Sequence, residues 1–261
     1  MKSRGMESES CKEQGIVYIA GAGCGNLITE AAKKLIEEVD VIVHDELLGE
    51  RVKELIERSK AEKIDAGKRA GKHKLRQEEI NELLVRLARE GKRVLRLKAG
   101  DPFIFGRGGE EMEYLAERGV RFAVVPGVSS AIAAPACAGI PVTHRRYDPA
   151  VVFITGRQAR ERLNWDALAK LNATIVILMG MASLKKNVRR LLEHGKDPET
   201  PAAVIQWGCC EKQRVVCSKL EDIAEVAERE GVGSPAIVVI GDVVSVRERV
   251  LEFFEGFFDC F

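Results

Sequence analysis

The segment from Gly100 to Glu111 has residue types that suit a ligand-binding loop. It reads Gly-Asp-Pro-Phe-Ile-Phe-Gly-Arg-Gly-Gly-Glu-Glu, follows an apolar run and leads into a helical pattern. Its four glycines surround two phenylalanines, which is not the composition of a core strand. Glycines let a loop press its backbone against a planar or polar ligand. We therefore predict a functional loop here, in preference to a structural turn.

A second candidate is the basic segment 67–74, which reads Gly-Lys-Arg-Ala-Gly-Lys-His-Lys. It is either a solvated surface loop or a clamp for carboxylates or phosphates, with which Arg and Lys pair strongly. Arg107, Arg145 and Arg146 are candidates to extend such a clamp. Asp45 ends an apolar run and is either a helix-capping carboxylate or a general base. The local sequence leaves these alternatives open.

The first glycine loop, Gly21 to Gly25, follows an apolar run and precedes a helical pattern. Glycines there allow close approach of the backbone to a ligand, and a helix N-terminus favours negative charge. A dinucleotide-binding fingerprint requires Gly-x-Gly-x-x-Gly, whereas the spacing here is Gly-x-Gly-x-Gly. A dinucleotide site and a plain tight turn are both compatible with this loop.

The elements that must position these residues alternate along the chain. Short apolar runs rich in β-branched residues predict strands. These runs are 16–20, 39–44, 94–97, 122–125, 151–154, 175–178, 203–205, 215–217 and 237–240. Apolar residues at helical spacing predict helices that include 80–88 and 184–192. The alternation of strands and helices predicts an α/β fold.

The chain is long enough for two α/β domains, since its 261 residues fit one large domain or two small ones. Polar residues and prolines interrupt the apolar pattern between Pro141 and Pro149. We therefore expect a disordered N-terminal tail, an N-terminal α/β domain and a C-terminal α/β domain, over 1–15, 16–146 and 147–261. The cleft between two such domains is the usual place for a ligand.

Composition argues against several function classes. The formal net charge is +1, from 41 basic and 40 acidic residues, which predicts no nucleic-acid partner. No apolar run approaches the roughly 18 residues of a membrane span, and the polar start lacks a signal core. We therefore expect no membrane partner and a cytoplasmic location. The Phe-rich stretch 251–261 should pack against the fold or a partner subunit.

The seven cysteines are scattered and lack the spacing of zinc ligands. The adjacent pair Cys209 and Cys210 could bind a soft metal. Reduced, structural thiols are nevertheless the default in a cytosolic chain, and we expect no metal.

Several of these segments together resemble the uroporphyrinogen-III C-methyltransferase branch of the tetrapyrrole methylase family. The resemblance rests above all on the Gly-Lys-Arg-Ala-Gly segment at 67–71 and on the block from Arg96 to Gly108. Further matching segments are 77–81, 125–131, 138–145, 153–156, 179–180, 213–216, 234–237 and 241–244. The similarity covers nearly everything from Ile16 to Val244.

This resemblance implies two α/β domains of the tetrapyrrole methylase type, with the active-site cleft and the methyl donor between them. It implies a methyltransferase that uses S-adenosyl-L-methionine, releases S-adenosyl-L-homocysteine and needs no metal. The expected substrate is uroporphyrinogen III, a tetrapyrrole that two successive methylations convert into precorrin-2, the precursor of sirohaem and cobalamin. The family also suggests a homodimer.

The resemblance further implies three groups of site residues. Asp45 matches the family's proposed proton acceptor, and Lys68 its proposed proton donor. Arg69, Lys72 and Arg107 are expected to bind the substrate carboxylates. Donor contacts are expected at Cys24, Ala99, Gly100, Asp101, Ile104, Ser129, Ser130, Met179 and Gly208.

The chain departs from the family pattern at some of these positions. The first glycine loop is shorter than usual, and Cys24 stands where proline is expected. Ala99 replaces a glycine. The sequence Trp-Gly-Cys-Cys at 207–210 replaces a commoner Gly-Thr.

Four alternatives remain for comparison. A methylase of a later corrin precursor would share the donor site and differ in the substrate clamp. Diphthine synthase shares the fold, but we expect it to lack the basic segment. A nicotinamide-dependent dehydrogenase would require the full glycine fingerprint, which is absent. A catalytically silent binding protein would not need to retain both Asp45 and Lys68.

Overall fold

The computed structural model describes residues 14–67, 75–157 and 162–255, and it divides into two compact units. The N-terminal unit consists of segments 1–22, 29–48 and 52–127. The C-terminal unit consists of segments 23–28, 49–51 and 128–261. Each unit has its own sheet and its own hydrophobic core.

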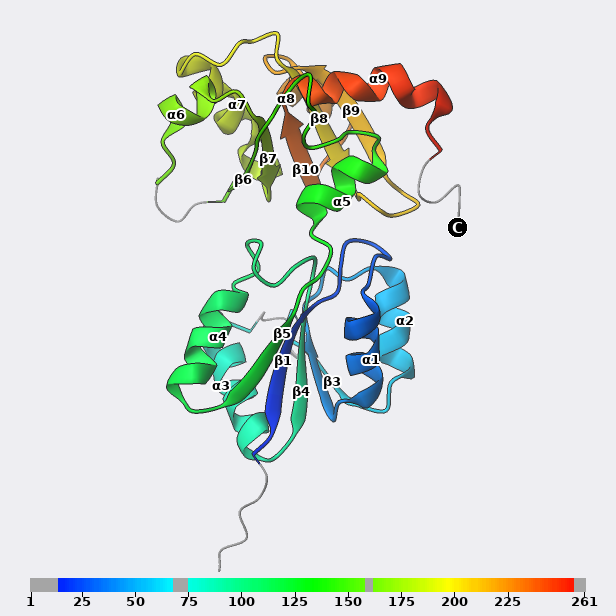
Figure 1. Cartoon of the computed structure of the whole chain (residues 1–261), viewed down its shortest axis with the longest axis vertical. Coiled ribbons are helices and arrows are strands. Elements are labelled where there is room, and N and C mark those ends of the chain that lie inside the picture. The colour runs from blue at the N-terminus through cyan, green and yellow to red at the C-terminus, as the bar shows by residue number, and fades with distance from the viewer. Residues whose placement is uncertain (1–13, 68–74, 158–161, 256–261) are drawn as a thin grey trace, which may run out of the picture. The chain divides into compact units, whose positions relative to one another are not determined.

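The sheet of the N-terminal unit is parallel, with the strand order β3-β2-β4-β1-β5 (Figure 1). Its strands are β1 (Ile16–Gly21), β2 (Val41–His44), β3 (Glu62–Asp65), β4 (Arg93–Lys98) and β5 (Arg121–Val125). The helices that follow them are α1 (Glu30–Glu38), α2 (Glu50–Arg58), α3 (Gln77–Arg89) and α4 (Gly108–Glu117).

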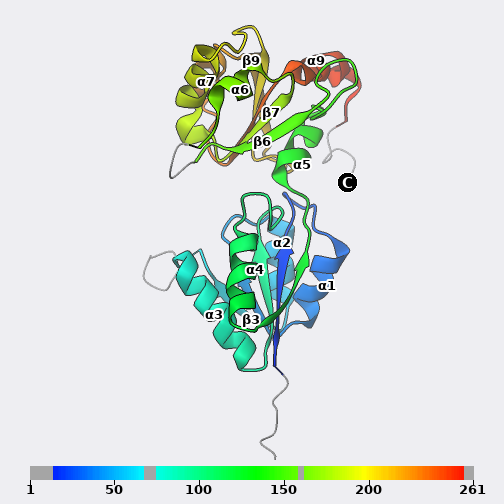
Figure 2. The ribbon, with the colours of Figure 1, turned by 60° about the vertical axis from the view of Figure 1, so that its left-hand side comes forward.

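Helices cover both faces of this parallel sheet. Figures 1 and 2 show α1 and α2 beside one face and α3 and α4 beside the other. The stripe predicted for residues 80–88 is buried in the core, where α3 contributes Ile80, Leu84 and Ala88. On α1 the buried positions are Ala32 and Ile36. Because both faces are covered, the central strands β1 and β4 are buried almost throughout, and the charged Arg96 and Lys98 of β4 are buried with their apolar neighbours.

The helices that follow the neighbouring strands β1 and β4 lie on opposite faces of the sheet. These strands are neighbours, yet β1 leads to α1 on one face and β4 leads to α4 on the other (Figure 1). Open α/β sheets bind their ligands at the carboxyl ends of strands at such a position. Gly21 lies opposite Lys98 in the register, so the first glycine loop and the loop that begins at Ala99 start side by side.

The sheet of the C-terminal unit is mixed, with the strand order β6-β7-β10-β8-β9. The pair β6 and β7 is parallel, and the remaining pairs are antiparallel. Its strands are β6 (Val151–Thr155), β7 (Thr174–Leu178), β8 (Pro201–Gln206), β9 (Arg214–Lys219) and β10 (Ala236–Ile240). Its α-helices are α5 (Ser130–Cys137), α6 (Trp165–Lys170), α7 (Leu184–Glu193), α8 (Ile223–Arg229) and α9 (Ser245–Val250). Short 3-10 helices lie at Met181–Ser183, Asp242–Val244 and Leu251–Phe253.

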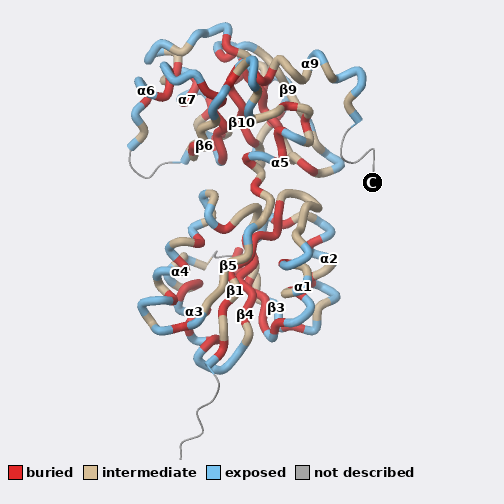
Figure 3. Tube along the Cα trace, in the orientation of Figure 1, coloured by how far each residue is buried: buried red, intermediate tan, exposed pale blue. Residues whose placement is uncertain are grey.

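The core of the C-terminal unit lies between this sheet and the helices α6, α7 and α8. Trp165, Leu191 and Ile223 come from these three helices and pack with alternate strand residues, among them Ile175 and Ile177. The helix α5 packs against β7 and β10. Figure 3 shows that the strands of both units are largely buried, whereas the outer faces of the helices are exposed.

The predicted strands and both predicted helices are present, with small shifts at their ends. The sequence did not predict β3, because its residues Glu62 to Asp65 are mostly polar and lack an apolar run. This polarity fits its place at the edge of the sheet, where one side of the strand has no neighbouring strand.

The division of the chain differs from the predicted boundary between 146 and 147. Residues 128–146 group with the C-terminal unit, because α5 at the start of this segment packs on β7 and β10. The predicted tail, 1–15, lies outside the described residues up to residue 13. Gly15 is attached to the fold, since its backbone N–H donates to the Ala88 carbonyl at 3.0 Å.

Candidate active site

Three glycines from separate segments meet at the carboxyl ends of β1, β4 and β5 in the N-terminal unit. A Cβ atom added at Gly21 would lie 2.4 Å from the Gly100 carbonyl oxygen, and one added at Gly127 would lie 2.1 Å from it. Gly100 itself has a φ of 66°. Only glycine fits these contacts, so no side chain at these positions covers the strand ends. This arrangement supports the prediction that the loop at Gly100 is functional.

The carboxylate of Asp101 holds two of these loops together. Its Oδ2 accepts a hydrogen bond from the Gly127 backbone N–H at 3.0 Å, and its Oδ1 accepts from the Phe103 N–H at 2.8 Å. Asp101 thus shapes the loop in which it was itself predicted to contact the methyl donor. Its neighbours Ala99, Gly100 and Ile104 are half-buried.

Asp45 lies at the same carboxyl ends of the strands, directly after β2. It forms part of a network of charged side chains. Its Oδ1 is 2.6 Å from an Arg96 guanidinium nitrogen. The Nε of Arg96 is 3.1 Å from Oε1 of Glu111, and the ammonium of Lys98 is 2.8 Å from that same oxygen. Gln77 also donates to Glu111 Oε1, at 2.9 Å. Two cations and two anions therefore compensate one another.

This network is buried, with exposed side-chain fractions of 2% for Arg96, 3% for Lys98 and 0% for Glu111. Asp45 is the member that reaches solvent, with 34% of its side chain exposed. The buried groups thus hold a carboxylate whose own surface remains partly accessible. That is the arrangement expected of a group that meets a ligand.

The network determines the charge of its members. Burial would raise the pKa of Asp45, but the positive charges of Arg96 and Lys98 outweigh it and hold that pKa below its ordinary value. Burial would lower the pKa of Arg96, yet Glu111 and Asp45 raise it, so the guanidinium stays charged. Burial and the charge of Arg96 lower the pKa of Lys98. Asp45 is therefore an ionised hydrogen-bond acceptor.

Sequence reasoning singled out Asp45 but assigned no role to its partners. Arg96 and Lys98 alternate with apolar residues in β4, at positions that are buried in this sheet. A buried charge requires a partner or a strong shift of its pKa. Charged residues inside a buried parallel strand are the signal that could have revealed the network, although not the identity of Glu111 as its centre.

The predicted substrate-binding residues are only partly visible. Lys68, Arg69 and Lys72 lie outside the described residues. Arg107 is exposed, directly precedes α4 with a φ of 62°, and donates from Nε to Glu110 at 2.7 Å. This ion pair orients Arg107 without removing it from solvent.

The predicted donor contacts Ser129 and Ser130 lie at the start of α5 in the C-terminal unit. Ser129 is the N-cap, and its hydroxyl accepts from the Ala131 backbone N–H at 3.2 Å. Met179 follows β7, has a φ of 53° and exposes 45% of its surface. A Cβ at Gly208 would lie 2.3 Å from the Cβ of Ala134. Gly208 thus lies against α5, one turn after Ser130.

Cys24 lies beside Gly208 within the C-terminal unit. Its thiol donates to the Gly208 carbonyl at 3.4 Å. A Cβ at the neighbouring Gly25 would lie 1.8 Å from the carbonyl oxygen of Cys209. The structure therefore brings Cys24 and Gly25 of the first glycine loop together with the Trp-Gly-Cys-Cys segment, at two of the places where the sequence departs from the family pattern.

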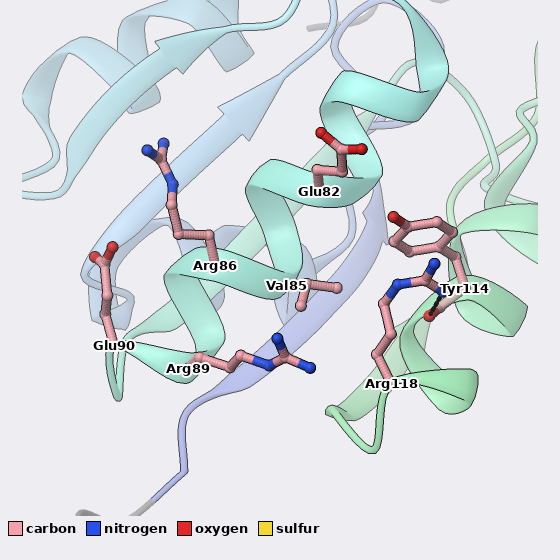
Figure 4. A pocket seen from close by; sticks show the side chains of 7 residues that line it. All are labelled: Glu82, Val85, Arg86, Arg89, Glu90, Tyr114 and Arg118. Atoms are coloured by element: carbon pink, nitrogen blue, oxygen red, sulfur yellow. Dashed lines mark hydrogen bonds between the residues drawn. The ribbon is translucent and has the colours of Figure 1, made fainter.

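An open hollow lies on the surface of the N-terminal unit (Figure 4). It is lined from α3 and α4 by Glu82, Val85, Arg86, Arg89, Glu90, Tyr114 and Arg118. The guanidinium of Arg118 lies over the Tyr114 ring, 3.3 Å from its centroid. The end of α3 borders the start of β1, so this hollow is near the amino ends of the strands, away from the glycine loops.

Within the described ranges 14–67, 75–157 and 162–255, His, Cys, Asp and Glu side chains form no group that could hold a metal ion. The helices in these ranges include none that is long and apolar enough to cross a membrane.

Comparison with known proteins gives a consistent family. The profile described as Tetrapyrrole (Corrin/Porphyrin) Methylases matches residues 16–224. An S-adenosyl-L-methionine-dependent uroporphyrinogen III methyltransferase of Methanosarcina barkeri is 50% identical over 240 residues, which are 90% of this chain and 94% of that protein. A siroheme synthase of Chromobacterium violaceum is 44% identical over 90% of this chain. The chain spans 51% of that longer protein.

Solved structures agree with the sequence comparison. Uroporphyrin-III C-methyltransferase of Thermus thermophilus, in complex with S-adenosyl homocysteine, superposes with a TM-score of 0.74 at 35% identity. The match covers 89% of this chain and 94% of that one. The predicted α/β fold of two domains is thereby confirmed.

Proposed function

Because the chain belongs to the tetrapyrrole methylase family, we propose that it is an S-adenosylmethionine-dependent uroporphyrinogen-III C-methyltransferase. Two successive methylations would convert uroporphyrinogen III into precorrin-2, for sirohaem or cobalamin. The observation that carries this proposal is the 50% identity to the Methanosarcina barkeri enzyme across 90% of the chain. Family membership alone would fit several tetrapyrrole substrates, whereas similarity at this level over nearly the whole chain favours this one.

The residues at the glycine loops fit the methyl donor. Glycine at positions 21 and 100 leaves backbone, without side chains, at the end of two neighbouring parallel strands. We propose that the donor is held in the N-terminal unit by Ala99, Gly100, Asp101 and Ile104. The proposed contacts in the C-terminal unit are Cys24, Ser129, Ser130, Met179 and Gly208. When bound, the donor supplies a methyl group on a positively charged sulfur.

We propose that Asp45 aligns the substrate by accepting hydrogen bonds from its pyrrole N–H groups. The lowered pKa of Asp45 favours this role over general-base catalysis, since a weakly basic carboxylate takes up a proton poorly. Its ionised oxygen forms charge-assisted hydrogen bonds, which are shorter and stronger than neutral ones. Alignment of a ring carbon with the methyl group accounts for a large part of such a reaction's acceleration.

The substrate's carboxylates would be bound by basic side chains. Arg107 is exposed and, like Asp45, lies at the carboxyl ends of the strands, because Arg107 ends the loop that follows β4. We propose that Lys68, Arg69 and Lys72 act with it, and that Lys68 donates a proton. Guanidinium groups pair with carboxylates in a bidentate manner, which would fix the orientation of the macrocycle.

The proposal is tested by anaerobic incubation of the protein with uroporphyrinogen III and S-adenosylmethionine, followed by mass spectrometry. We expect a product that is two methyl groups heavier than the substrate. The Asp45→Asn variant should still bind S-adenosyl homocysteine in calorimetry but should lose about 100-fold in turnover, because the substrate would no longer be aligned with the methyl group. Donor binding without any methylation would instead indicate a later corrin precursor as the substrate.

We also propose that the protein is a cytoplasmic homodimer, as its family suggests. Light scattering in solution should then give about twice the chain mass of 28.8 kDa. A mass equal to that of one chain at micromolar concentration would contradict the dimer without affecting the proposed chemistry.

A further inference from the structure

Two cysteines of the C-terminal unit lie in direct contact although 72 positions separate them in the sequence. The Sγ atoms of Cys137 and Cys209 are 3.0 Å apart. Cys137 is the last residue of α5, and Cys209 lies in the loop that follows β8. A disulfide bond requires a sulfur separation near 2.05 Å, so a further approach of about 1 Å would allow the bond to form.

The surrounding backbone holds these two cysteines together independently of their sulfurs. The Oε1 of Gln213 accepts from the Cys209 N–H at 3.0 Å. The Nε2 of the same side chain donates to the Cys137 carbonyl at 3.0 Å. The close contact between Gly208 and Ala134 joins the same loop to the same helix. The two thiols are therefore neighbours because of the fold, and the loop entropy of bringing them together is already lost.

The environments of the two thiols differ in a way that suits sequential thiol chemistry. Cys137 is half-buried, whereas Cys209 is fully buried. The hydrogen bond with Cys209 lowers the pKa of Cys137. The same bond, a second one with Cys24, and burial raise the pKa of Cys209. An oxidant from solution thus reaches Cys137, which is also the thiol that ionises more readily.

We propose that Cys137 and Cys209 form a reversible disulfide by exchange with a low-molecular-weight disulfide. Cys137 is the attacking thiol and Cys209 the resolving thiol. The bond would join α5 to the loop after β8. These two segments carry Ser129, Ser130 and Gly208, three residues predicted to contact the methyl donor, so the modification would lie within the C-terminal part of that site.

The exchange balances in two steps. The Cys137 thiolate attacks one sulfur of the small disulfide, whose sulfur–sulfur bond breaks and releases one thiolate. Cys209 then attacks the Cys137 sulfur of this mixed disulfide, releases the second small thiolate and gives up its proton to a leaving thiolate. The protein is oxidised by two electrons, and the small disulfide is reduced to two thiols.

The test uses the full-length reduced protein and glutathione disulfide, without substrate or donor. After the reaction is stopped with acid, free thiols are alkylated and tryptic fragments are mapped without reduction. Cleavage places Cys137 in fragment 122–145 and Cys209 in fragment 197–212. We expect these two fragments to be linked, with fragmentation assigning the bond to Cys209 and not to Cys210, and dithiothreitol should separate them.

Three variants show whether the order of the steps is right. Cys209→Ser should leave glutathione attached to Cys137, because no resolving thiol remains. Cys137→Ser should leave Cys209 unmodified, since Cys209 is buried. Cys217→Ser is the matched control, as Cys217 is also half-buried but belongs to β9, and it should not affect the link.

Several results would overturn the inference. A wild-type protein that retains glutathione on Cys137, or a Cys209 that pairs with Cys24, would show that the contact does not lead to the proposed bond. Alkylation of Cys137 and Cys209 as complete as that of Cys217 after oxidation would show that neither thiol reacts. Because the test requires no turnover, its failure would leave the proposed methyltransferase activity unaffected.

Discussion

At the scale of single residues, Asp45 keeps its charge because Arg96 contacts it directly and Lys98 lies nearby. The carboxylate of Glu111 in turn compensates both cations. Such networks are stable when they are complete and costly when one member is removed. Activity and stability should therefore respond differently to each member.

Removal of the Arg96 charge should change the pH dependence of turnover. In the wild type the pKa of Asp45 is lowered, so the carboxylate stays ionised until the pH falls below its ordinary range. In Arg96→Gln, burial would still raise this pKa while the main opposing charge would be gone. The acid limb of the kcat profile should move to higher pH. An acid limb at the wild-type position would show that Arg96 does not control Asp45.

Two adjacent glutamates allow a matched test of stability. Glu111→Gln leaves Arg96 and Lys98 buried without their shared anion, and the free energy of unfolding should fall by roughly 3 kcal/mol or more. Glu110 pairs with Arg107 at the surface, so Glu110→Gln should change it by less than about 0.5 kcal/mol. Urea unfolding measures both, and equal effects would contradict a special role of the buried network.

The sequence could predict Asp45 but not its partners, for a physical reason. Asp45 ends an apolar strand, which is a local pattern, whereas the pairing of Arg96 with Glu111 depends on where the packing of α4 on α3 and β5 places Glu111. Lys68, Arg69 and Lys72 remain predictions, since they lie outside the described residues.

At the scale of elements, the loops and helix starts do more than connect strands. Ser129 caps α5, and the loop after β8 packs against the same helix through Gly208. A capping hydroxyl stabilises its helix, and we propose that this one also contacts the methyl donor. Helix stabilisation and donor binding can be separated by comparison with a capping residue that stabilises its helix but is not proposed to contact the donor.

Thr29 provides that comparison, because its hydroxyl caps α1 by accepting from the Ala32 N–H at 3.2 Å. Thr29→Ala and Ser129→Ala should each lower the free energy of unfolding by about 1 kcal/mol. Only Ser129→Ala should also weaken the binding of S-adenosyl homocysteine in calorimetry. Equal donor affinity in both variants would remove Ser129 from the proposed donor contacts.

The sequence predicted those strands and helices that show a clear local pattern of apolar residues. It did not predict features that depend on where a segment packs in the fold. Runs such as 175–178 are apolar because their strand is buried on both faces, so the pattern is visible in the sequence. The edge strand β3 reads Glu-Lys-Ile-Asp, and only its pairing with β2 makes it a strand. The helix α5 is likewise apolar enough to be buried, but its sequence does not say in which unit.

At the scale of the whole molecule, each unit has a separate core. Leu84 is fully buried in the N-terminal core and Leu191 in the C-terminal core, and the two belong to different clusters. Replacement of either leucine by alanine should cost about 2–5 kcal/mol, because both leave a cavity.

The effect of Leu84→Ala should be largest within its own unit. Hydrogen exchange should show that the amides of β1 and β4 lose protection, while those of β7 and β10 keep most of theirs. The reciprocal pattern is expected for Leu191→Ala. Equal loss of protection in both sheets for either variant would show that the two cores unfold as one cooperative body.

The position of β1 has a consequence for the order in which the chain can fold during its synthesis. This strand is synthesised before both of its neighbours in the sheet, β4 and β5, which end at Lys98 and Val125. One edge of this apolar strand thus stays unpaired until Lys98 has been made, and the other edge until Val125 has been made. The helices α1 to α3 and the β2–β3 pair can form before β4 has been made, so β1 is inserted between two strands that are synthesised after it. The unpaired edges of β1 therefore expose the nascent chain to aggregation until β5 has been made.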